Sequence, residues 1–234
     1  MIHVYKKPGE TIDQLVDRVK KEYNIGKLGY TARLDPMAKG IVPFVTNNLC
    51  SNIKDYLSSA KTYQVKIIMG IQTDSDDPLG LITNTHFIVN EDIITDTKKS
   101  IINYLNLINN TSFRQKFHYY STKMMNHRRR KTNGVVNDHD VSLYNYEILG
   151  EDTFDYGLWS KKIIKYINLI DQKKNFRQDI TIEQWEKLKI DKLFYIKLKI
   201  KVSSGFFIRQ LIRDMSNNIG FPLMCYNINR TSID

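Results

Sequence analysis

Cysteine is scarce in this chain: Cys50 and Cys225 are the only two among 234 residues, and they form no C-x-x-C pair. This argues against a secreted fold stapled by disulfides and fits a reducing compartment. No apolar run approaches the roughly 18 residues that a membrane-spanning helix needs, and the opening MIHVYKKPGE has no apolar signal segment. We therefore expect a soluble intracellular protein, cytoplasmic unless an organelle or the nucleus holds it.

Patterns that bind metals or nucleotides are also missing. The five histidines show no H-x-x-x-H or similar spacing, and the two cysteines are far apart, which disfavours a zinc site. Neither G-x-x-x-x-G-K-[ST] nor G-x-G-x-x-G occurs, so nothing in the sequence favours a nucleotide cofactor. The sequence therefore predicts neither a metal nor a cofactor.

Basic residues outnumber acidic ones, 35 against 25, which gives a formal net charge of +10. Such an excess favours a polyanionic partner, either nucleic acid or an anionic surface. The stretch from Thr97 to Asn137 contains no acid at all, and aromatic residues lie between its basic ones. A charge run is most often a solvated face, but this composition also favours RNA binding. The RNA contacts are expected from the end of this stretch, at Lys123, Arg128, Arg129, Arg130 and Lys131.

Hydrophobic periodicity predicts alternating helices and strands. Thr11 suits the N-cap of an amphipathic helix that begins at Ile12. Alternating and apolar runs predict strands at 2–5, 41–45, 62–71, 82–89, 141–149 and 193–202. Further helices are predicted at 51–59, 91–107, 159–170, 181–188 and 207–218. This order of elements predicts an α+β fold with a mixed, largely antiparallel sheet and flanking helices.

Two loops carry residue types that can do chemistry, and each also has a structural interpretation. KLGYTARLDPMAKG places Asp35 before a proline, between glycines that are ordinary turn formers. The same carboxylate, held rigidly at the floor of a cleft, can act as a nucleophile. SSGFFIRQLIRD places Arg209 after two aromatic residues at the start of a helix. These residues either pack in the core with a surface charge beside them, or present a guanidinium and rings to a bound base.

Two further motifs are more ambiguous. KTYQVKI places Tyr63 on an alternating strand, where a tyrosine is usually a half-buried packing residue. QTDSDDPLG brings Asp74, Asp76 and Asp77 together, which suggests a metal site. The glycine and glutamate spacing of an EF-hand is absent, however. A structural turn is therefore the favoured interpretation.

In their order along the chain, these motifs resemble those of the TruB family of RNA pseudouridine synthases. GYTARLDPMAKGIVPF is similar to the family's G-H-T-G-x-L-D-P-x-A-x-G-x-L-P, and KTYQVKIIMGIQTDSDDPLG to K-x-Y-x-x-x-x-x-L-G-x-x-T-D-T-x-D-x-x-G. VSSGFFIRQLIRDM is similar to C-S-K-G-T-Y-I-R-x-L-x-x-D-L, and YKKPGET to D-K-P-x-G-x-[TS]. YSTKMMNHRRR weakly resembles the family's S-A-x-K-x-x-G loop, which lies next to the RNA. The resemblance covers about residues 4–149 and 193–232 and implies the pseudouridine synthase fold.

The resemblance also implies a role for individual residues. Asp35 matches the catalytic aspartate, Tyr63 the tyrosine that stacks on the target base, and Arg209 the arginine that pairs with the catalytic carboxylate. Phe207 stands where the family usually has tyrosine, and Tyr30 where it usually has a histidine that contacts the flipped nucleotide. The other implied substrate-binding residues are Lys7 at the edge of the site, Thr31 in the pocket loop, Ile228 in the wall of the uracil pocket, and Arg230.

By this resemblance the chain is expected to isomerise uridine to pseudouridine, at position 55 in the T-loop of tRNA. The reaction needs a group that bonds transiently to the sugar or the base, and a carboxylate does so without a cofactor. The uridine must first be flipped out of its stack. The chain is expected to be a monomer and to bind RNA, tRNA in particular. No membrane association is expected. Two alternatives remain open: a non-catalytic RNA-binding or tRNA-folding module of the same fold, and a metal-dependent nuclease built on Asp74, Asp76 and Asp77.

We expect one catalytic domain over residues 1–234, with an insertion at about 150–191 where the resemblance lapses. Many relatives continue past this point into a small C-terminal PUA domain, and none is expected here because the chain stops at Asp234. The insertion is rich in lysine. It either replaces the RNA contacts of a PUA domain or is a surface elaboration without a role.

Overall fold

The computed structural model describes residues 1–46, 50, 59–86, 91–121 and 138–234. Several predictions fall outside these described residues: nearly all of the helix at 51–59 and the end of the strand at 82–89. The five basic residues expected to contact RNA also lie outside them, namely Lys123, Arg128, Arg129, Arg130 and Lys131.

A mixed sheet of eight strands runs through the molecule in the order β1-β3-β10-β4-β9-β8-β7, with β2 paired to β3 off this path. β3 and β10 run parallel, and the other pairs are antiparallel. Its strands are β1 (Ile2–Lys6), β2 (Leu28–Tyr30), β3 (Lys39–Thr46), β4 (Lys61–Met69), β7 (Thr111–Gln115), β8 (His139–Asp155), β9 (Lys192–Val202) and β10 (Leu223–Ile233). β5 (Ile71–Thr73) and β6 (Ile82–Thr85) form a separate hairpin. The predicted mixed, largely antiparallel sheet is confirmed.

Five helices of the described residues flank this sheet: α1 (Ile12–Tyr23), α2 (Glu91–Ile108), α4 (Tyr156–Leu169), α5 (Gln178–Lys187) and α6 (Ile208–Ile219). Thr11 is the N-cap of α1, as the sequence predicts, and the structure shows that it forms a capping box. The Thr11 hydroxyl accepts from the Gln14 amide at 3.1 Å, and the Gln14 side chain accepts from the Thr11 amide at 2.8 Å. Within the described part of the chain, every helix is too short or too polar to span a bilayer.

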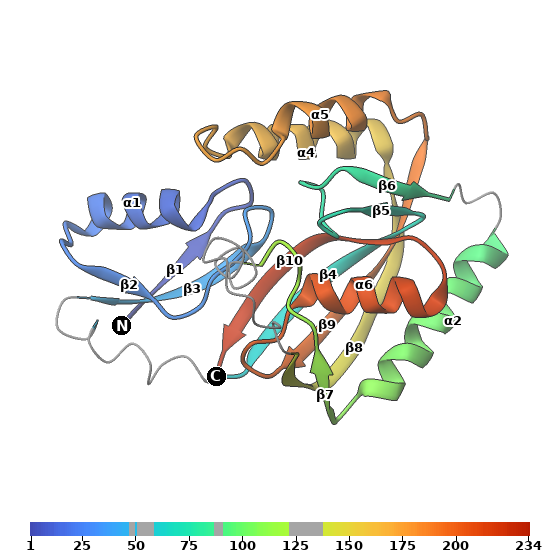
Figure 1. The fold of residues 1–234 in the computed structure, drawn as a ribbon, viewed down its shortest axis with the longest axis horizontal. Coiled ribbons are helices and arrows are strands. Elements are labelled where there is room, and N and C mark those ends of the chain that lie inside the picture. The colour runs from blue at the N-terminus through green and yellow to red at the C-terminus, as the bar shows by residue number, and fades with distance from the viewer. Residues whose placement is uncertain (47–49, 51–58, 87–90, 122–137) are drawn as a thin grey trace, which may run out of the picture.

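Alternation along the central strands gives the sheet two apolar faces, each covered by helices. Val65 and Ile67 of β4 face a core that includes Leu211 of α6. The next residue of the strand, Ile68, belongs to a second core with Ile163 of α4 and Trp185 of α5. Figure 1 shows α6 crossing the strands while α4 and α5 lie side by side beyond the β5–β6 hairpin. The segment at 150–191 is therefore not a loose surface elaboration but the cover of one core.

The structure corrects two strand boundaries and adds strands that were not predicted. The strand predicted at 62–71 is interrupted at Gly70, whose φ is +90°, and the chain then pairs as β5 with β6. The strand predicted to end at Gly150 continues to Asp155, because Gly150 takes a φ of +126° at a register shift and does not end the pairing. The strands β2, β7 and β10 were not predicted. β10 lies between β3 and β4 and is buried along most of its length, so it shows no clean alternation.

Candidate active site

Asp35 lies in the connection between β2 and β3, in a turn that the chain closes with a bond from the Ala38 amide to the Asp35 carbonyl at 3.0 Å. Lys6, the last residue of β1, fixes this turn by bonding to its backbone. Its buried ammonium donates to the carbonyls of Pro36 at 3.1 Å and Ala38 at 2.7 Å. The turn predicted from the Asp-Pro pair is therefore present, and its backbone is held in one position.

Lys6 was missed from the sequence, where Lys7 was expected at the edge of the site. Lys7 is exposed, and its backbone amide donates to Glu10. The alternation of β1 carries the signal that finds Lys6, because Val4 and Lys6 face inward. Burial lowers the pKa of Lys6 to about 8, while the nearby Glu10 and Asp35 carboxylates oppose that shift. Lys6 is charged at neutral pH and adds positive charge beneath Asp35.

The guanidinium of Arg209, in the first turn of α6, forms an ion pair with the carboxylate of Asp35. Arg209 Nε lies 2.8 Å from Asp35 Oδ2, and Arg209 Nη2 lies 2.8 Å from Oδ1. This is the planar two-bond fork that an arginine makes with a carboxylate. The Arg209 side chain is 7% exposed and that of Asp35 40% exposed. The pairing expected from the sequence is present. In this pair the arginine is buried, and the carboxylate is accessible from solvent.

The remaining side of the Arg209 guanidinium is held by the turn between β5 and β6. Nη1 donates to the Ser75 carbonyl at 3.1 Å and lies 3.5 Å from Asp77 Oδ2. Asp77 is itself fixed, because its Oδ1 accepts from the Ser75 hydroxyl at 2.7 Å and the Leu79 amide at 3.0 Å. Burial raises the pKa of Asp77 to about 6, and the Arg209 charge opposes this. The arginine is therefore oriented by two carboxylates, one exposed and one buried.

The other two carboxylates of this turn are also committed to ion pairs. Asp74 receives a two-bond fork from Arg177 at 2.7 and 3.1 Å. Asp76 Oδ2 contacts both Arg213 at 2.7 Å and His118 at 2.8 Å. The favoured prediction of a structural turn is confirmed. Among the described residues, no group of three or more His, Cys, Asp or Glu side chains is arranged to hold a metal ion.

A cavity of about 370 Å³ opens in front of Asp35. Besides Asp35, it is lined by five residues of the predicted site: Thr31, Tyr63, Phe207, Ile228 and Arg230. Two predicted residues lie elsewhere: Lys7 is exposed just beyond the end of β1, and Tyr30 packs instead beside Arg33, whose guanidinium is 5.1 Å from the ring centroid. Lys61 also lines the cavity and was not predicted; burial lowers its pKa to about 8.

Arg230 shapes the cavity more than it lines it. Its buried guanidinium donates to the carbonyls of Ile41 at 2.7 Å, Arg33 at 3.0 Å and Ala32 at 3.0 Å, which fixes the loop that follows Thr31. The backbone of Arg230 also runs against Gly40, where a Cβ would lie 2.3 Å from the Arg230 carbonyl oxygen. Glycine is required there for β3 to pair with β10.

Three aromatic residues line the cavity, namely Tyr63, Phe206 and Phe207, and the first and last of them are held differently. Tyr63 on β4 is 6% exposed, and burial raises its pKa, which keeps the phenol neutral. Phe207 is fixed through its backbone, because Gln115 donates to its carbonyl at 3.1 Å and accepts from its amide at 2.8 Å. Its ring meets the stacked pair of Phe117 and His139 edge-on. Tyr63 and Phe207 form part of the apolar wall of the cavity that Asp35 also lines, and the Phe117 and His139 rings pack against Phe207.

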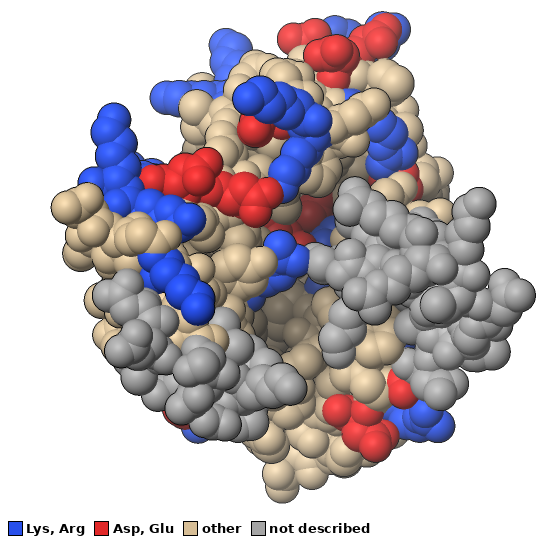
Figure 2. Space-filling model, turned by 60° about the vertical axis from the view of Figure 1, so that its left-hand side comes forward, with Lys and Arg blue, Asp and Glu red and all other residues tan. Residues whose placement is uncertain are grey.

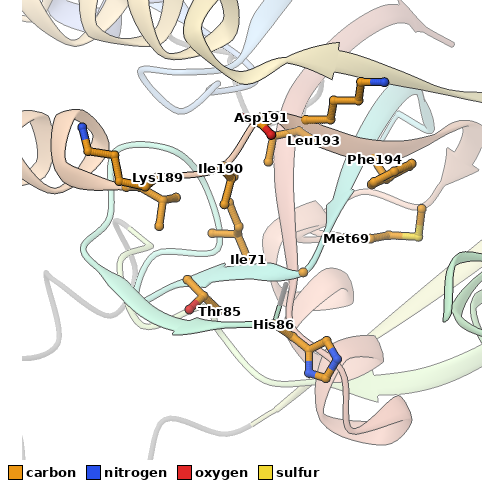
Figure 3. Close-up of a pocket in the computed structure, with 12 residues that line it drawn as sticks. Met69, Ile71, Thr85, His86, Lys189, Ile190, Asp191, Leu193 and Phe194 are labelled. Carbon is orange, nitrogen blue, oxygen red and sulfur yellow. The ribbon is translucent and has the colours of Figure 1, made fainter. Parts of the chain in front are cut away.

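A second cavity of similar volume lies between the β5–β6 hairpin and the connection from α5 to β9 (Figure 3). Its wall is formed by Met69, Ile71, His86, Ile190 and Phe194 among others. No residue of the predicted site is among the described residues that line it. The cavity at Asp35 is therefore the stronger candidate. Figure 2 shows a face of the molecule hollowed near its centre, with Lys and Arg side chains at the upper edge of the hollow.

Sequence comparison relates this arrangement to known proteins. Residues 20–152 match the model of the TruB family pseudouridylate synthase (N terminal domain). The chain is 31% identical over 220 residues to tRNA pseudouridine synthase B of Mycoplasma capricolum, covering 93% of this chain and 62% of that relative. It is 25% identical to the protein of that name from Clostridium tetani, covering 99% of this chain and 66% of the relative. The chain thus spans less than two thirds of the length of each.

Solved structures share the fold at lower identity. A chain in a Cbf5-Nop10-Gar1 complex aligns with a TM-score of 0.57 and 17% identity, covering 99% of this chain and 48% of that one. A chain in an H/ACA RNP bound to a substrate RNA containing 2′-deoxyuridine aligns with a TM-score of 0.55 and 17% identity, covering 99% of this chain and 46% of that one. The predicted pseudouridine synthase-like fold is confirmed.

Proposed function

Because this chain belongs to the TruB family of pseudouridylate synthases, we propose that it isomerises uridine to pseudouridine in RNA, with Asp35 as the nucleophile. The observation that carries the proposal is the Asp35 carboxylate itself. It is fixed by the Arg209 fork yet 40% exposed, and it faces a cavity with an aromatic wall. A fixed and reachable carboxylate is what nucleophilic catalysis without a cofactor requires.

The proposed reaction moves the uracil on its own ribose. The C1′–N1 bond breaks, the base turns, and a C1′–C5 bond forms. The proton on C5 leaves to solvent, and N1 takes up a proton, so that the nucleoside keeps its composition. Asp35 bonds transiently to the sugar or the base while the base turns. Arg209 orients the carboxylate, because its guanidinium holds both carboxylate oxygens in a two-bond fork.

The remaining residues of the cavity have proposed roles in holding the uridine. Tyr63 and Phe207 pack against the flipped base, Ile228 forms a wall of its pocket, and Thr31 directly precedes the loop that Arg230 fixes. A flipped base gains stacking on such rings in place of the stacking it loses. Lys61, at the same cavity, supplies a cation for the backbone of the flipped nucleotide. Lys7 and Tyr30 lie outside the cavity and have no part in this proposal.

We propose tRNA as the substrate and uridine 55 in its T-loop as the target. Two observations support this: the relatives above carry the name tRNA pseudouridine synthase B, and the chain has a net charge of +10. A net positive charge favours RNA as a partner. Carbodiimide mapping with primer extension, on tRNA exposed to the purified protein, tests the position directly. A stop at any site other than position 55 would contradict this substrate.

Release of tritium from tRNA labelled at C5 of uridine tests the activity. We expect release by the wild-type chain with EDTA present, and none by the Asp35→Asn variant. Tight RNA binding without release would instead support a non-catalytic RNA-binding module. RNA cleavage that EDTA abolishes would support a nuclease, for which Asp74, Asp76 and Asp77 would have to leave their ion pairs with arginine.

A further inference from the structure

The segment that carries α4 and α5 binds one turn of the molecule, residues 74–82, at several points. Arg177 donates its two-bond fork to Asp74 at the start of this turn. Farther along, Trp185 Nε1 donates to the Pro78 carbonyl at 2.9 Å, and the Thr181 hydroxyl donates to the Leu79 carbonyl at 3.2 Å. These bonds join α5 and the residue before it to the backbone and side chains of the turn.

The same turn holds the arginine of the candidate active site. Arg209 donates to the Ser75 carbonyl and lies against Asp77, as described above. Arg213, one helical turn later, donates to the Asp74 carbonyl at 2.7 Å and to the Asp76 carboxylate at 2.7 Å. Asp74 is therefore the point where the two sets of contacts meet, with Arg177 on its side chain and Arg213 on its backbone.

The local backbone around Arg177 is arranged to make this contact. Arg177 has a φ of +62°, a left-handed conformation that residues other than glycine rarely adopt. The Asn175 side chain accepts from the Arg177 amide at 3.0 Å, and the Arg177 carbonyl accepts from the Thr181 amide at 3.0 Å at the start of α5. The Arg177 guanidinium also lies over the Tyr120 ring, and the Tyr120 hydroxyl donates to Asp74 at 2.9 Å.

From this geometry we propose that Arg177 is a positioning residue: through Asp74 it sets the turn that holds the Arg209 guanidinium against Asp35. The chain of contacts runs from Arg177 to Asp74, through the neighbouring Ser75 and Asp77 to Arg209, and ends at Asp35. The segment at 150–191 then contributes to catalysis by holding the turn at 74–82, and not by contacting RNA. The catalytic part of this inference rests on the proposed function.

The test compares Arg177→Ala and Arg177→Lys with a control from the same segment, Lys174→Ala. Lys174 pairs with Asp13 on α1, away from the turn. We expect Arg177→Ala to lower kcat by about tenfold or more while KM for RNA changes by less than about threefold. Arg177→Lys, which keeps the charge and loses the fork, should recover part of that activity. Lys174→Ala should match wild type.

Two outcomes would overturn the proposal. A rise in KM at unchanged kcat, with a shallower salt dependence of RNA binding, would assign Arg177 to phosphate binding. Wild-type kinetics in Arg177→Ala would leave the ion pair with Asp74 without a role in catalysis. If the two residues act as a pair, combining Arg177→Ala with Asp74→Asn should lower kcat by less than the product of the two single effects. Fully additive effects would contradict the proposal.

A second measurement needs no activity. The Leu81 amide donates to Asp74 Oδ1 at 2.9 Å, so its hydrogen exchange reports on the turn. We expect faster exchange at Leu81 in Arg177→Ala, with unchanged exchange at Ile67 in the central strand β4 as evidence of intact folding. Unchanged exchange at Leu81 would contradict positioning by Arg177. If the wild-type chain forms no pseudouridine, the proposed function fails, and this exchange result still decides whether Arg177 holds the turn.

Discussion

The guanidinium of Arg209 and the carboxylate of Asp35, 174 positions apart in the chain, meet through two contacts of 2.8 Å each. Asp35 lies in a loop before β3 and Arg209 in the first turn of α6. The arginine is buried and the carboxylate is partly exposed. This asymmetry leaves one partner to orient and the other to react.

Replacing Asp35 by asparagine should abolish turnover and leave RNA binding nearly intact. A carboxamide keeps the shape of the side chain but cannot act as the nucleophile. RNA affinity should change by less than tenfold, about 1.4 kcal/mol. Tritium release and a filter-binding titration measure the two quantities. Turnover by Asp35→Asn above a few per cent of wild type would remove Asp35 from the mechanism.

Replacing Arg209 by lysine should lower kcat by about a hundredfold, or roughly 2.7 kcal/mol. A lysine presents a point charge and cannot make the planar fork with Asp35. The matched control is Arg18→Lys, which alters a similar fork to Glu10; neither of these two residues lines the cavity. The control should keep full activity. If Arg209→Lys kept the full activity expected of Arg18→Lys, the two-bond geometry of the Arg209–Asp35 pair would not matter for turnover.

His118 should make the fold sensitive to mild acid. Burial, and next the Arg209 charge, lower the pKa of His118 to about 2. The neutral ring suits its contacts, since Nδ1 accepts from the Tyr120 amide while Nε2 donates to Asp76. Because His118 in the unfolded chain takes up a proton below its ordinary pKa of about 6.5, the contribution of this group to stability is full above that pH and falls as the pH falls.

We expect this one group to cost about 1 kcal/mol of unfolding free energy between about pH 7.5 and 5.5. His118→Gln keeps a donor for Asp76 but does not titrate, so its stability should fall less over that range by a similar amount. His3→Gln, at an exposed position, serves as the control and should follow wild type. Urea unfolding at the two pH values measures the difference. Parallel curves for wild type and His118→Gln would show that His118 titrates normally.

Replacing Arg128, Arg129 and Arg130 together by glutamine should weaken RNA binding and its dependence on salt. They belong to the acid-free stretch of the sequence, outside the described residues. For every phosphate that the variant no longer neutralises, the log–log salt slope should fall in magnitude by roughly 0.7 to 0.9. Lys20→Gln with Lys21→Gln, on the exposed side of α1, provides a comparison. An unchanged slope in the triple variant would make this stretch a solvated face.

Local patterns in the sequence were enough to predict much of the fold. The N-cap at Thr11 and the alternation of β9 depend on neighbouring residues, and both are present in the structure. β10 escaped prediction because it is buried between two strands, where alternation vanishes. The strand end predicted at Gly150 is wrong because a glycine signals either an end or a bulge, and the choice is made by the pairing partner β9.

The sequence by itself determined the chemistry that is available here: the Asp35 turn, the arginine at the start of α6, and the basic charge excess. Short-range spacing carries this information, because turns and helix starts form from adjacent residues. Only the tertiary structure decided which charges meet. Three contacts join residues distant in the chain: Lys6 with the Asp35 turn, Asp77 with Arg209, and Arg177 with Asp74. Such pairings depend on the strand order and on the docking of α4 and α5, which no local pattern contains.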